Sequence, residues 1–446
     1  MRSRAVLAMW GLVAPALIAA AGAPAAAAPL TLAQAVAIAA DSNAAVRLAG
    51  LKTDEAASRR GQSLAPLLPG ISADASTLNR TYSLKALGFN PGAVPGETAP
   101  ADLVGPFDVV DARVHASQTL FDVASWVRLR AAGESVRVAG AEQGQSVEGA
   151  AQGAALAYLR SARAQAVADA RRADLALAQQ LLTLADDQRR AGVAPGIDVT
   201  RARTQVAAAR GQVIMAENGL ERAHIDLARA LGLDPGARFD LADTLSADLA
   251  ASPAPTDSAA ALALALERRP DLAVERHKLA RAHAEESAIK AERLPRLDVS
   301  GDVGLSGDSW ESPTTTREAA IAASMPIFDG WRRESRIGEQ RAVIAESEVR
   351  SRDLARQIAA EVRGALLDLG SGLEQYTVAT EGLALAEQEL SEARERFSSG
   401  IAGNIDVITA QVSLVRARDA LIDSRYAIAT ARVGLARAAG VCRDVH

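Results

Sequence analysis

Cysteine is nearly absent from this chain of 446 residues, which has one, Cys442. A single thiol cannot form a disulfide within the chain or supply a cysteine zinc cluster. Aromatic residues make up only 3% of the sequence, whereas apolar residues of all kinds make up 49%. This composition argues against several aromatic-packed globular cores and favours long helices that lie close together through small side chains.

An excess of positive charge is also lacking, because 49 lysine and arginine residues face 54 aspartate and glutamate residues. With a formal net charge of −5 spread along the chain, we expect no nucleic-acid partner. Motifs of catalysis are missing too: there is no phosphate-binding loop, no Gly-x-Ser-x-Gly and no His-Glu-x-x-His. His277 and His283 are six residues apart and fall on different faces of a helix. We expect no enzyme activity, no cofactor and no metal site.

The N-terminus has the pattern of a cleaved secretory signal. Arg2 and Arg4 precede an almost wholly apolar run, 5–20, and small residues follow at 23–28. We expect a signal peptide at 1–27, with cleavage one residue earlier or later as alternatives. A retained membrane anchor is a further alternative, although the run is shorter than the ~20 residues that span a bilayer. No cysteine lies near the cleavage site, so we expect no lipid anchor there.

The sequence contains an internal duplication. Residues 192–199 (Gly-Val-Ala-Pro-Gly-Ile-Asp-Val) reappear as 400–407 (Gly-Ile-Ala-Gly-Asn-Ile-Asp-Val), 208 positions later. A Phe-Asp pair precedes each copy of this segment at a similar distance. We therefore divide the mature chain into a first repeat, 30–252, a second repeat, 253–440, and a C-terminal tail, 441–446. The first repeat carries about 19 extra residues, rich in Gly, Pro and Ala, which predict a long loop near 85–105.

Along each repeat, the spacing of apolar residues changes from helical to alternating and then back to helical. Helical spacing at about 31–65 and 257–293 gives way to strict alternation, which predicts strands with one apolar and one polar face. A helical stretch of about 68 residues follows each Phe-Asp pair, and a returning helix follows each glycine turn. The predicted strands lie at about 70–80, 111–121, 296–305 and 317–328.

The returning helices carry apolar residues on a strict seven-residue repeat. The two equivalent stripes are Val206, Val213, Leu220 and Leu227, and Leu414, Leu421, Ile428 and Leu435. The apolar face is wider than a two-stranded seam needs, which suits helices with neighbours on both sides. An ordinary antiparallel coiled coil is the alternative.

Four strands of about ten residues have the length that crosses an outer membrane when tilted. Four strands cannot close a barrel, and lipid does not tolerate open sheet edges. At least two chains must therefore contribute, and three would give twelve strands. The alternative is a soluble four-stranded sheet, for which polar-face residues such as Arg113, Asp298, Asp302 and Glu318 are equally natural.

The order of helices, strands and glycine turns resembles the TolC-like family of outer-membrane efflux and secretion channels, the outer membrane factors. Short sequence motifs also resemble those of the family at 30–35 (Leu-Thr-Leu-Ala-Gln-Ala), at 325–330 (Met-Pro-Ile-Phe-Asp-Gly) and at both glycine turns. The resemblance implies a mainly α fold with membrane β structure. It implies a homotrimer in which long periplasmic helices form an α-barrel and four strands per chain contribute to a shared twelve-stranded outer-membrane β-barrel.

The resemblance also implies site residues. Six residues match the family's tip motif, to which the periplasmic adaptor docks: Gly192, Val193, Ala194, Gly400, Ile401 and Ala402. Glycine permits the positive φ of a tight helix reversal, and small neighbours allow close approach. Alternatively, the glycines only end their helices.

Asp406 matches a family aspartate near the periplasmic constriction, and Asp198 holds the equivalent place in the first repeat. Three copies of one carboxylate around an aperture favour cations and raise one another's pKa. The sequence departs from the family pattern at Thr409 and Ala402, where a second acid and a basic residue are missing. Each aspartate has an alternative role as a cap of its helix N-terminus.

Taken as a whole, the resemblance implies an outer-membrane protein that extends into the periplasm and serves as the passive exit duct of a tripartite efflux pump. Its expected partners are an adaptor, an inner-membrane pump reached through the adaptor, and outer-membrane lipid. Two alternatives stay open. One is the outer-membrane component of a type I protein secretion system, and the other is a soluble periplasmic coiled-coil scaffold without a pore.

Overall fold

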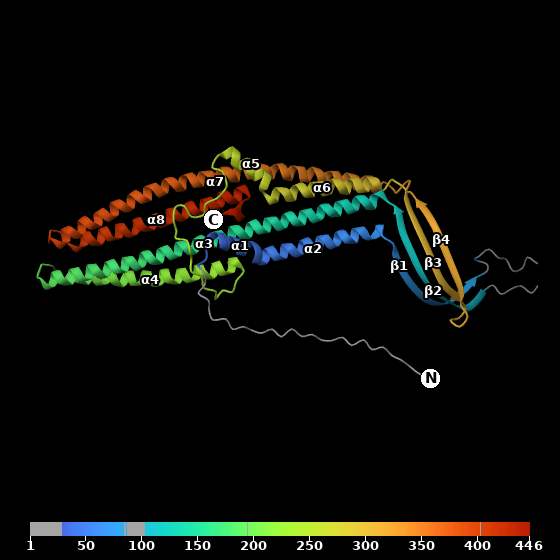
Figure 1. The fold of residues 1–446 in the computed structure, drawn as a ribbon, viewed down its shortest axis with the longest axis horizontal. Coiled ribbons are helices and arrows are strands. Elements are labelled where there is room, and N and C mark those ends of the chain that lie inside the picture. Colours follow the sequence, from blue (N-terminus) through green and yellow to red (C-terminus); the bar gives the residue numbers. More distant parts are fainter. Residues whose placement is uncertain (1–28, 84–85, 87–102, 194, 402) are drawn as a thin grey trace, which may run out of the picture.

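The chain folds into an elongated bundle of long helices with a small sheet at one end (Figure 1). The computed structural model describes residues 29–83, 86, 103–193, 195–401 and 403–446. The expected signal peptide at 1–27, and most of the expected loop at 85–105, therefore lie outside the described residues. The elements are α1 (Leu32–Ser42), α2 (Ala44–Leu64), η1 (Ala65–Leu67), β1 (Gly70–Ser83), β2 (Leu103–Phe121), α3 (Val123–Arg190), α4 (Gly196–Leu231), α5 (Ser258–Arg268), α6 (Pro270–Ala291), β3 (Arg296–Gly307), β4 (Thr314–Ser324), α7 (Arg332–Ser398), α8 (Asn404–Ala439) and η2 (Cys442–Asp444).

The two long helices are α3, with 68 residues, and α7, with 67 residues, as the missing helix breakers predict. At 1.5 Å per residue each spans roughly 100 Å. On the side of the sheet, α2, α3, α6 and α7 lie side by side, and toward the far end α4, α3, α8 and α7 do so. The predicted apolar stripe of α8 is buried throughout, whereas Val213 and Leu220 of the α4 stripe stay partly exposed.

The start of α7 differs from the prediction that each long helix directly follows its Phe-Asp pair. After Asp329, Gly330 and Trp331 adopt left-handed conformations with φ of 69° and 64°, so α7 begins only at Arg332. In the first repeat, Asp122 is itself the helix cap, and its side chain accepts a hydrogen bond from the Ser125 amide at 3.2 Å. The two copies therefore enter their long helices through different turns.

Each of the shorter helical segments is broken by one extended residue, which the sequence pattern does not locate. Asn43 separates α1 from α2, and Arg269 separates α5 from α6. Both residues cap the returning helix of their own repeat: Asn43 Nδ2 donates to the Ala230 carbonyl at 3.0 Å, and Arg269 Nη1 approaches the Ala438 carbonyl at 3.5 Å. Each repeat therefore has a joint, in which the residue between its two short helices caps the returning helix. This residue is neutral in the first repeat and a cation in the second.

The four strands form one antiparallel sheet in the order β1-β2-β3-β4. Directly opposed residues confirm the predicted faces, because Ala73, Val114 and Val303 form an apolar row beside the polar row that joins His115 to Asp302. β1 and β2 are longer than the ten residues predicted, at 14 and 19 residues. β2 already begins at Leu103, within the expected loop, and not at 111.

The predicted end of β4 at residue 328 is wrong. β4 ends at Ser324, two residues before Pro326, whose nitrogen has no hydrogen to donate to a sheet. Within the described residues, β1 and β4 each have one edge without a neighbouring strand.

The main hydrophobic core lies at mid-length, where α1, the segment between α4 and α5, and the C-terminal residues cover α3 and α8. The Tyr158 hydroxyl is fully buried there, 2.8 Å from the Leu30 carbonyl and 2.9 Å from Asp243 Oδ2. The expected tail at 441–446 is packed on this core, because the amide of Cys442 donates to Glu148 Oε2 at 2.8 Å. Burial, together with the Glu148 carboxylate, raises the pKa of the Cys442 thiol to about 12.

None of the described helices has an apolar stretch long enough to cross a membrane.

Candidate functional site at the helical tips

Two tight reversals form the end of the molecule opposite the sheet (Figure 1). Gly192 and Gly400 have φ of 78° and 70°, in the left-handed region that glycine accepts without strain. In the first turn, the Val193 amide donates to the Gln188 carbonyl at 3.0 Å, and in the second the Ile401 amide donates to the Arg396 carbonyl at 2.9 Å. These bonds satisfy the last carbonyls of α3 and α7. The repeated glycine motif therefore folds into the same turn twice.

The exposed surface of both turns is apolar. Val193 and Ile401, which correspond between the repeats, are 68% and 73% exposed. Ile197 and Ile405, at the starts of α4 and α8, also correspond and are about half exposed. The other two expected tip residues, Ala194 and Ala402, lie outside the described residues. Four apolar side chains thus point to solvent at the tip, which is the usual property of a contact surface.

The two expected constriction aspartates occupy different environments. Asp198 is buried, and its carboxylate lies 3.5 Å from Arg201 Nη1 on the next turn of α4. Asp406 is exposed in the first turn of α8. Their helix caps are Pro195 and Gly403, which have no side chain that could cap, and in the described chain neither carboxylate accepts a hydrogen bond from a backbone amide. Only Asp406 is therefore available to solvent as a charge.

Two buried hydrogen bonds tie the two turns to each other. Gln188 Nε2, near the end of α3, donates to the Phe397 carbonyl of α7 at 2.8 Å. Asn404 Nδ2, at the start of α8, donates to the Asp198 carbonyl of α4 at 3.0 Å. Sequence reasoning misses both residues, because their partners belong to the other repeat. The sequence does contain a signal at Asn404, because the equivalent residue of the first repeat is Gly196. A polar side chain at only one of two equivalent turns indicates a contact that only that turn makes.

A charged cluster holds α3 against α8 further along the helices. Arg171 of α3 contacts Asp419 at 2.6 Å and Asp174 at 3.1 Å, and Arg418 of α8 contacts Asp174 at 2.8 Å. Burial alone would lower the pKa of Arg171, but its hydrogen bonds to Asp419 and Asp174 outweigh burial and raise it. The cluster therefore stays charged and joins the two repeats by complementary ion pairs.

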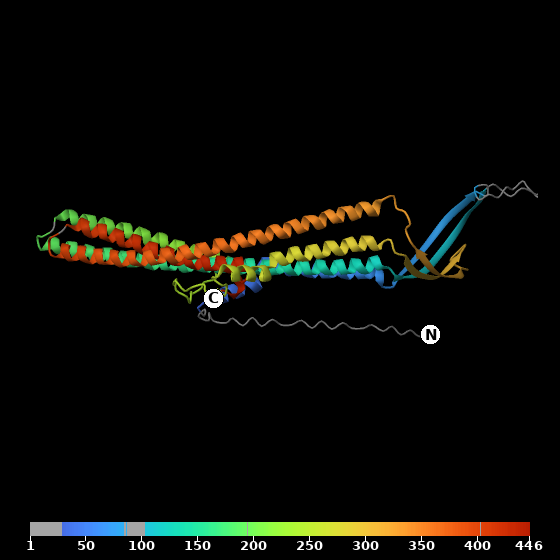
Figure 2. The same ribbon diagram turned by 90° about the horizontal axis from the view of Figure 1, so that it is seen from above.

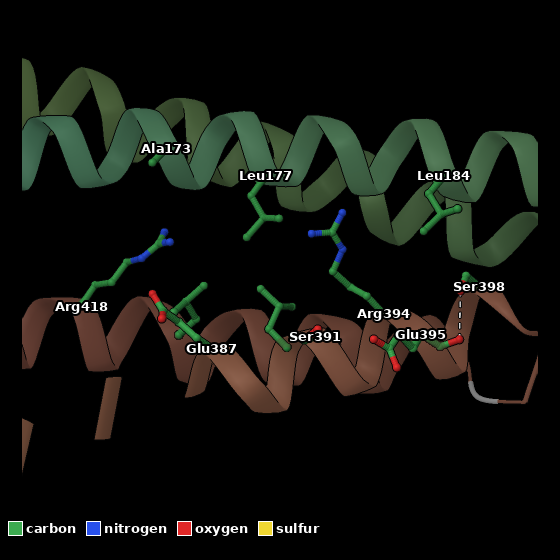
Figure 3. A pocket seen from close by; sticks show the side chains of 11 residues that line it. Ala173, Leu177, Leu184, Glu387, Ser391, Arg394, Glu395, Ser398 and Arg418 are labelled. Carbon is green, nitrogen blue, oxygen red and sulfur yellow. Dashed lines mark hydrogen bonds between the residues drawn. The ribbon is translucent and has the colours of Figure 1, made fainter. Parts of the chain in front are cut away.

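A groove of about 520 Å³ opens between α3 and α7 near the tip. Figure 3 shows Leu177 and Leu184 pointing from α3 toward α7, while Arg394 and Arg418 extend into the same space. The groove combines an apolar wall with charged rims, which suits the apolar face of an amphipathic helix.

Replacement of Gly400 by alanine should destabilise the second turn by about 1–2 kcal/mol, because an alanine in the left-handed region is strained. No heavy atom lies within 4 Å of an added Cβ there, so the cost is conformational and not steric. The matched control is Gly364→Ala inside α7, which also meets no atom within 4 Å and should stabilise by about 0.5–1 kcal/mol. Thermal unfolding midpoints that move in the same direction for both variants would contradict this account of the turn.

Comparison with known proteins decides the family. A family model described as outer membrane efflux protein matches residues 35–233 and 261–441, which is most of the chain. The chain belongs to the outer membrane efflux protein family. The two matched segments begin within α1 and within α5 and cover the rest of the first and the second set of helices and strands, up to the end of α8. This is a family of outer-membrane channels and not an enzyme family, which places the chain at the outer membrane.

Individual members of the outer membrane efflux protein family are only distantly similar in sequence. Protein CyaE of Bordetella pertussis is 25% identical over 259 residues, which cover 57% of this chain and 54% of CyaE. The pyoverdine export outer membrane protein OpmQ of Pseudomonas aeruginosa is 26% identical over 341 residues, which cover 75% of this chain and 67% of OpmQ. The chain thus spans about half the length of most of the curated relatives it matches.

The fold is shared with solved channels of the family. The crystal structure of the Campylobacter jejuni CmeC outer membrane channel superposes with a TM-score of 0.76 at 18% identity, covering 92% of this chain and 85% of CmeC. This likeness confirms the predicted combination of long helices with four antiparallel strands.

Among the described residues, no group of three or more His, Cys, Asp or Glu side chains is placed to hold a metal ion.

Proposed function

We propose that the chain is the outer-membrane exit duct of a tripartite efflux pump, a passive channel across the periplasm and the outer membrane. The observation that carries this proposal is the four-stranded sheet with two unpaired edges, placed at one end of helices roughly 100 Å long. In lipid, an unpaired edge has no partner for its amides and carbonyls. Three copies that pair β4 of one with β1 of the next would close a twelve-stranded barrel and remove every open edge.

Exposed apolar side chains on both edges of the protomer support a homotrimer. Ile327, Phe328 and Trp331, beside β4 and α7, are each more than two-thirds exposed. Leu51 and Ile71, beside α2 and β1 at the other edge, are exposed to a similar degree. A neighbouring protomer would cover both sets, so that one contact buries two apolar edges at once.

The tip is the proposed docking surface for the periplasmic adaptor. Its apolar side chains, Val193, Ile197, Ile401 and Ile405, together with Gly192 and Gly400, are accessible, and the groove beside them suits an incoming helix. Asp406 is the proposed constriction residue, because it is exposed and would be repeated three times around the axis. Asp198 is the weaker candidate, since it is buried beside Arg201. Energy would come from an inner-membrane pump reached through the adaptor, because the duct itself catalyses no reaction.

The names of relatives support efflux but do not assign a substrate. OpmQ is named for export of pyoverdine, and TtgF of Pseudomonas putida for efflux of toluene, which are chemically unlike.

The test is conductance. Protein extracted from the outer membrane and inserted in a planar bilayer should pass potassium and chloride without any nucleotide, and a matching extract from cells that lack the chain should not. Absence of current from the intact protein, with or without an adaptor, would favour a scaffold over a duct.

A further inference from the structure

A second groove, of about 670 Å³, lies at the other end of the helices, between α2, α3 and α6. Small α3 residues form its floor, and Ala131, Val138 and Ala139 are buried there. Arg128 is five residues from the start of α3, and Arg60 is four residues from the end of α2, so the groove reaches to within about 8 Å of the ends of these helices, next to the sheet. Figure 1 shows α2, α3 and α6 side by side along this stretch.

Basic side chains outnumber carboxylates in the lining of the groove. Six basic side chains line it: Lys52, Arg59, Arg60, Arg128, Lys278 and Arg281. Against the three lining carboxylates, Glu55, Glu142 and Glu285, the lining has a net charge of +3, which the two paired glutamates beside it, Glu275 and Glu292, reduce to +1. The groove therefore has a small surplus of positive charge, although the whole chain has a net charge of −5.

Carboxylates neutralise only part of this charge. Glu55 is paired with Arg59 at 2.6 Å, Glu275 is paired with Lys278 at 2.9 Å, and Glu292 is paired with Arg128. Glu285 lies 3.6 Å from Arg281 Nε, which is too far for a hydrogen bond. Arg281 Nε is buried and has no acceptor among the described residues. No ion pair joins Lys52 or Arg60 to any residue that the structure describes. Donors are thus left for a ligand.

The groove lies on the face of α3 opposite the mid-length core. Ser135 and Glu142 line the groove, whereas Ala151 and Tyr158, each sixteen residues later, pack under α1 and the segment before α5. Sixteen residues of α-helix turn through about 1600°, which leaves them about 160° apart. Figure 2 shows α1 and the C-terminus on one side of the helical layer. In a closed trimer these covering elements must lie outside, because three copies of them would fill the bore, so the groove faces the axis.

We propose that this groove binds multivalent anions, solutes with several carboxylates or phosphates, at the inner wall of the duct. The inference rests on the proposed function, because the axial position requires a closed trimer. The cationic groups of Lys52 and Arg60 on α2, and Arg281 Nε on α6, can donate charge-assisted hydrogen bonds to such a ligand. Three grooves around one axis would give a ring of positive charge that retains anionic cargo at the outer end of the helical tunnel.

The probe is citrate, a small trivalent carboxylate, added to the detergent-extracted full chain. At low salt, calorimetry should show saturable binding with one site per chain, and 0.5 M KCl should weaken it, because salt screens exposed charges. The double variant Lys52→Gln, Arg60→Gln should bind citrate about tenfold more weakly. The matched control is Arg47→Gln, Arg130→Gln, which removes the same charge from exposed positions of α2 and α3 that do not line the groove. The control should bind like wild type.

Two results would overturn the proposal: no citrate binding by the intact protein, or an equal loss in both double variants. Channel current, recorded on the same preparations, separates this proposal from the proposed function. Current without citrate binding would reject the anion groove and leave the duct standing. Binding without current would reject the duct, and with it the axial position of the groove. Citrate that binds and also lowers the current of wild type, but not of Lys52→Gln, Arg60→Gln, would support both.

Discussion

Replacement of Arg269 by alanine should destabilise the protein by about 3–5 kcal/mol, the usual cost of breaking a buried ion pair from one side. The Arg269 side chain is only 3% exposed and contacts Asp271 of α6 at 2.6 Å and Glu361 of α7. Its Nη1 also approaches the Ala438 carbonyl at the end of α8, at 3.5 Å. Loss of Arg269 leaves two partly buried carboxylates without their cation and removes the side chain that links α6, α7 and α8.

The matched control for this change is Arg268→Ala, because Arg268 is exposed and makes no ion pair among the described residues. Its unfolding midpoint should move by less than the equivalent of about 0.5 kcal/mol. Similar shifts in unfolding midpoint for the two variants would show that the joint does not depend on the buried cation.

The same joint makes stability depend on pH. Burial alone would raise the pKa values of Asp271 and Glu361, but hydrogen bonds and attraction to Arg269 outweigh burial and hold both below their ordinary values of 3.8 and 4.5. A depressed carboxylate pKa contributes stability that is present above the ordinary pKa and is lost as the pH falls through the folded value. Wild type should therefore lose stability more steeply than Arg269→Ala as the pH falls below about 4.5.

The double variant Gln188→Ala, Asn404→Ala should raise the channel conductance several-fold. Each change removes a buried hydrogen bond between the two turns, worth about 1 kcal/mol, so the contact between the hairpins α3–α4 and α7–α8 is weakened at the tip. Single-channel recording in a planar bilayer measures the effect. Gln180→Ala is the matched control, because Gln180 is an exposed glutamine of α3. Unchanged conductance in the double variant, together with lowered stability, would reduce these bonds to a purely structural role.

How far the sequence predicts this protein depends on whether a feature is local. The length of α3 is predictable because no proline occurs in its 68 residues, and the tip turns are predictable because a glycine motif occurs twice. The end of β4 is misplaced because the apolar alternation continues past Pro326 to Ile327. The start of α7 is misplaced because the left-handed conformations of Gly330 and Trp331 leave no periodic signal. The helix breaks escape the apolar spacing, since apolar residues continue on both sides of Asn43 and Arg269. Only the second break has a local signal, because Pro270 disfavours the helical conformation of Arg269 before it.

The residues of the candidate site also fall into a group that local sequence predicts and a group that depends on tertiary packing. Gly192 and Gly400 are identified by sequence spacing, and the exposed apolar residues beside them share the same offset of 208. Gln188, Asn404 and the cluster around Asp174 depend on how one repeat packs on the other, and the sequence does not specify that packing locally. The difference between Asp198 and Asp406 is likewise tertiary, because equal residues at equal positions become one buried and one exposed carboxylate.

The central claim is that several copies of this chain share one membrane sheet. Its most direct test is to express the chain with its N-terminal segment, fractionate the envelope and determine the native mass of the detergent-extracted protein. We expect recovery from the outer membrane at about three times the mass of the mature chain, because three copies pair every edge of β1 and β4. Recovery as a soluble periplasmic monomer or dimer would contradict the account, since the strands would then not meet lipid.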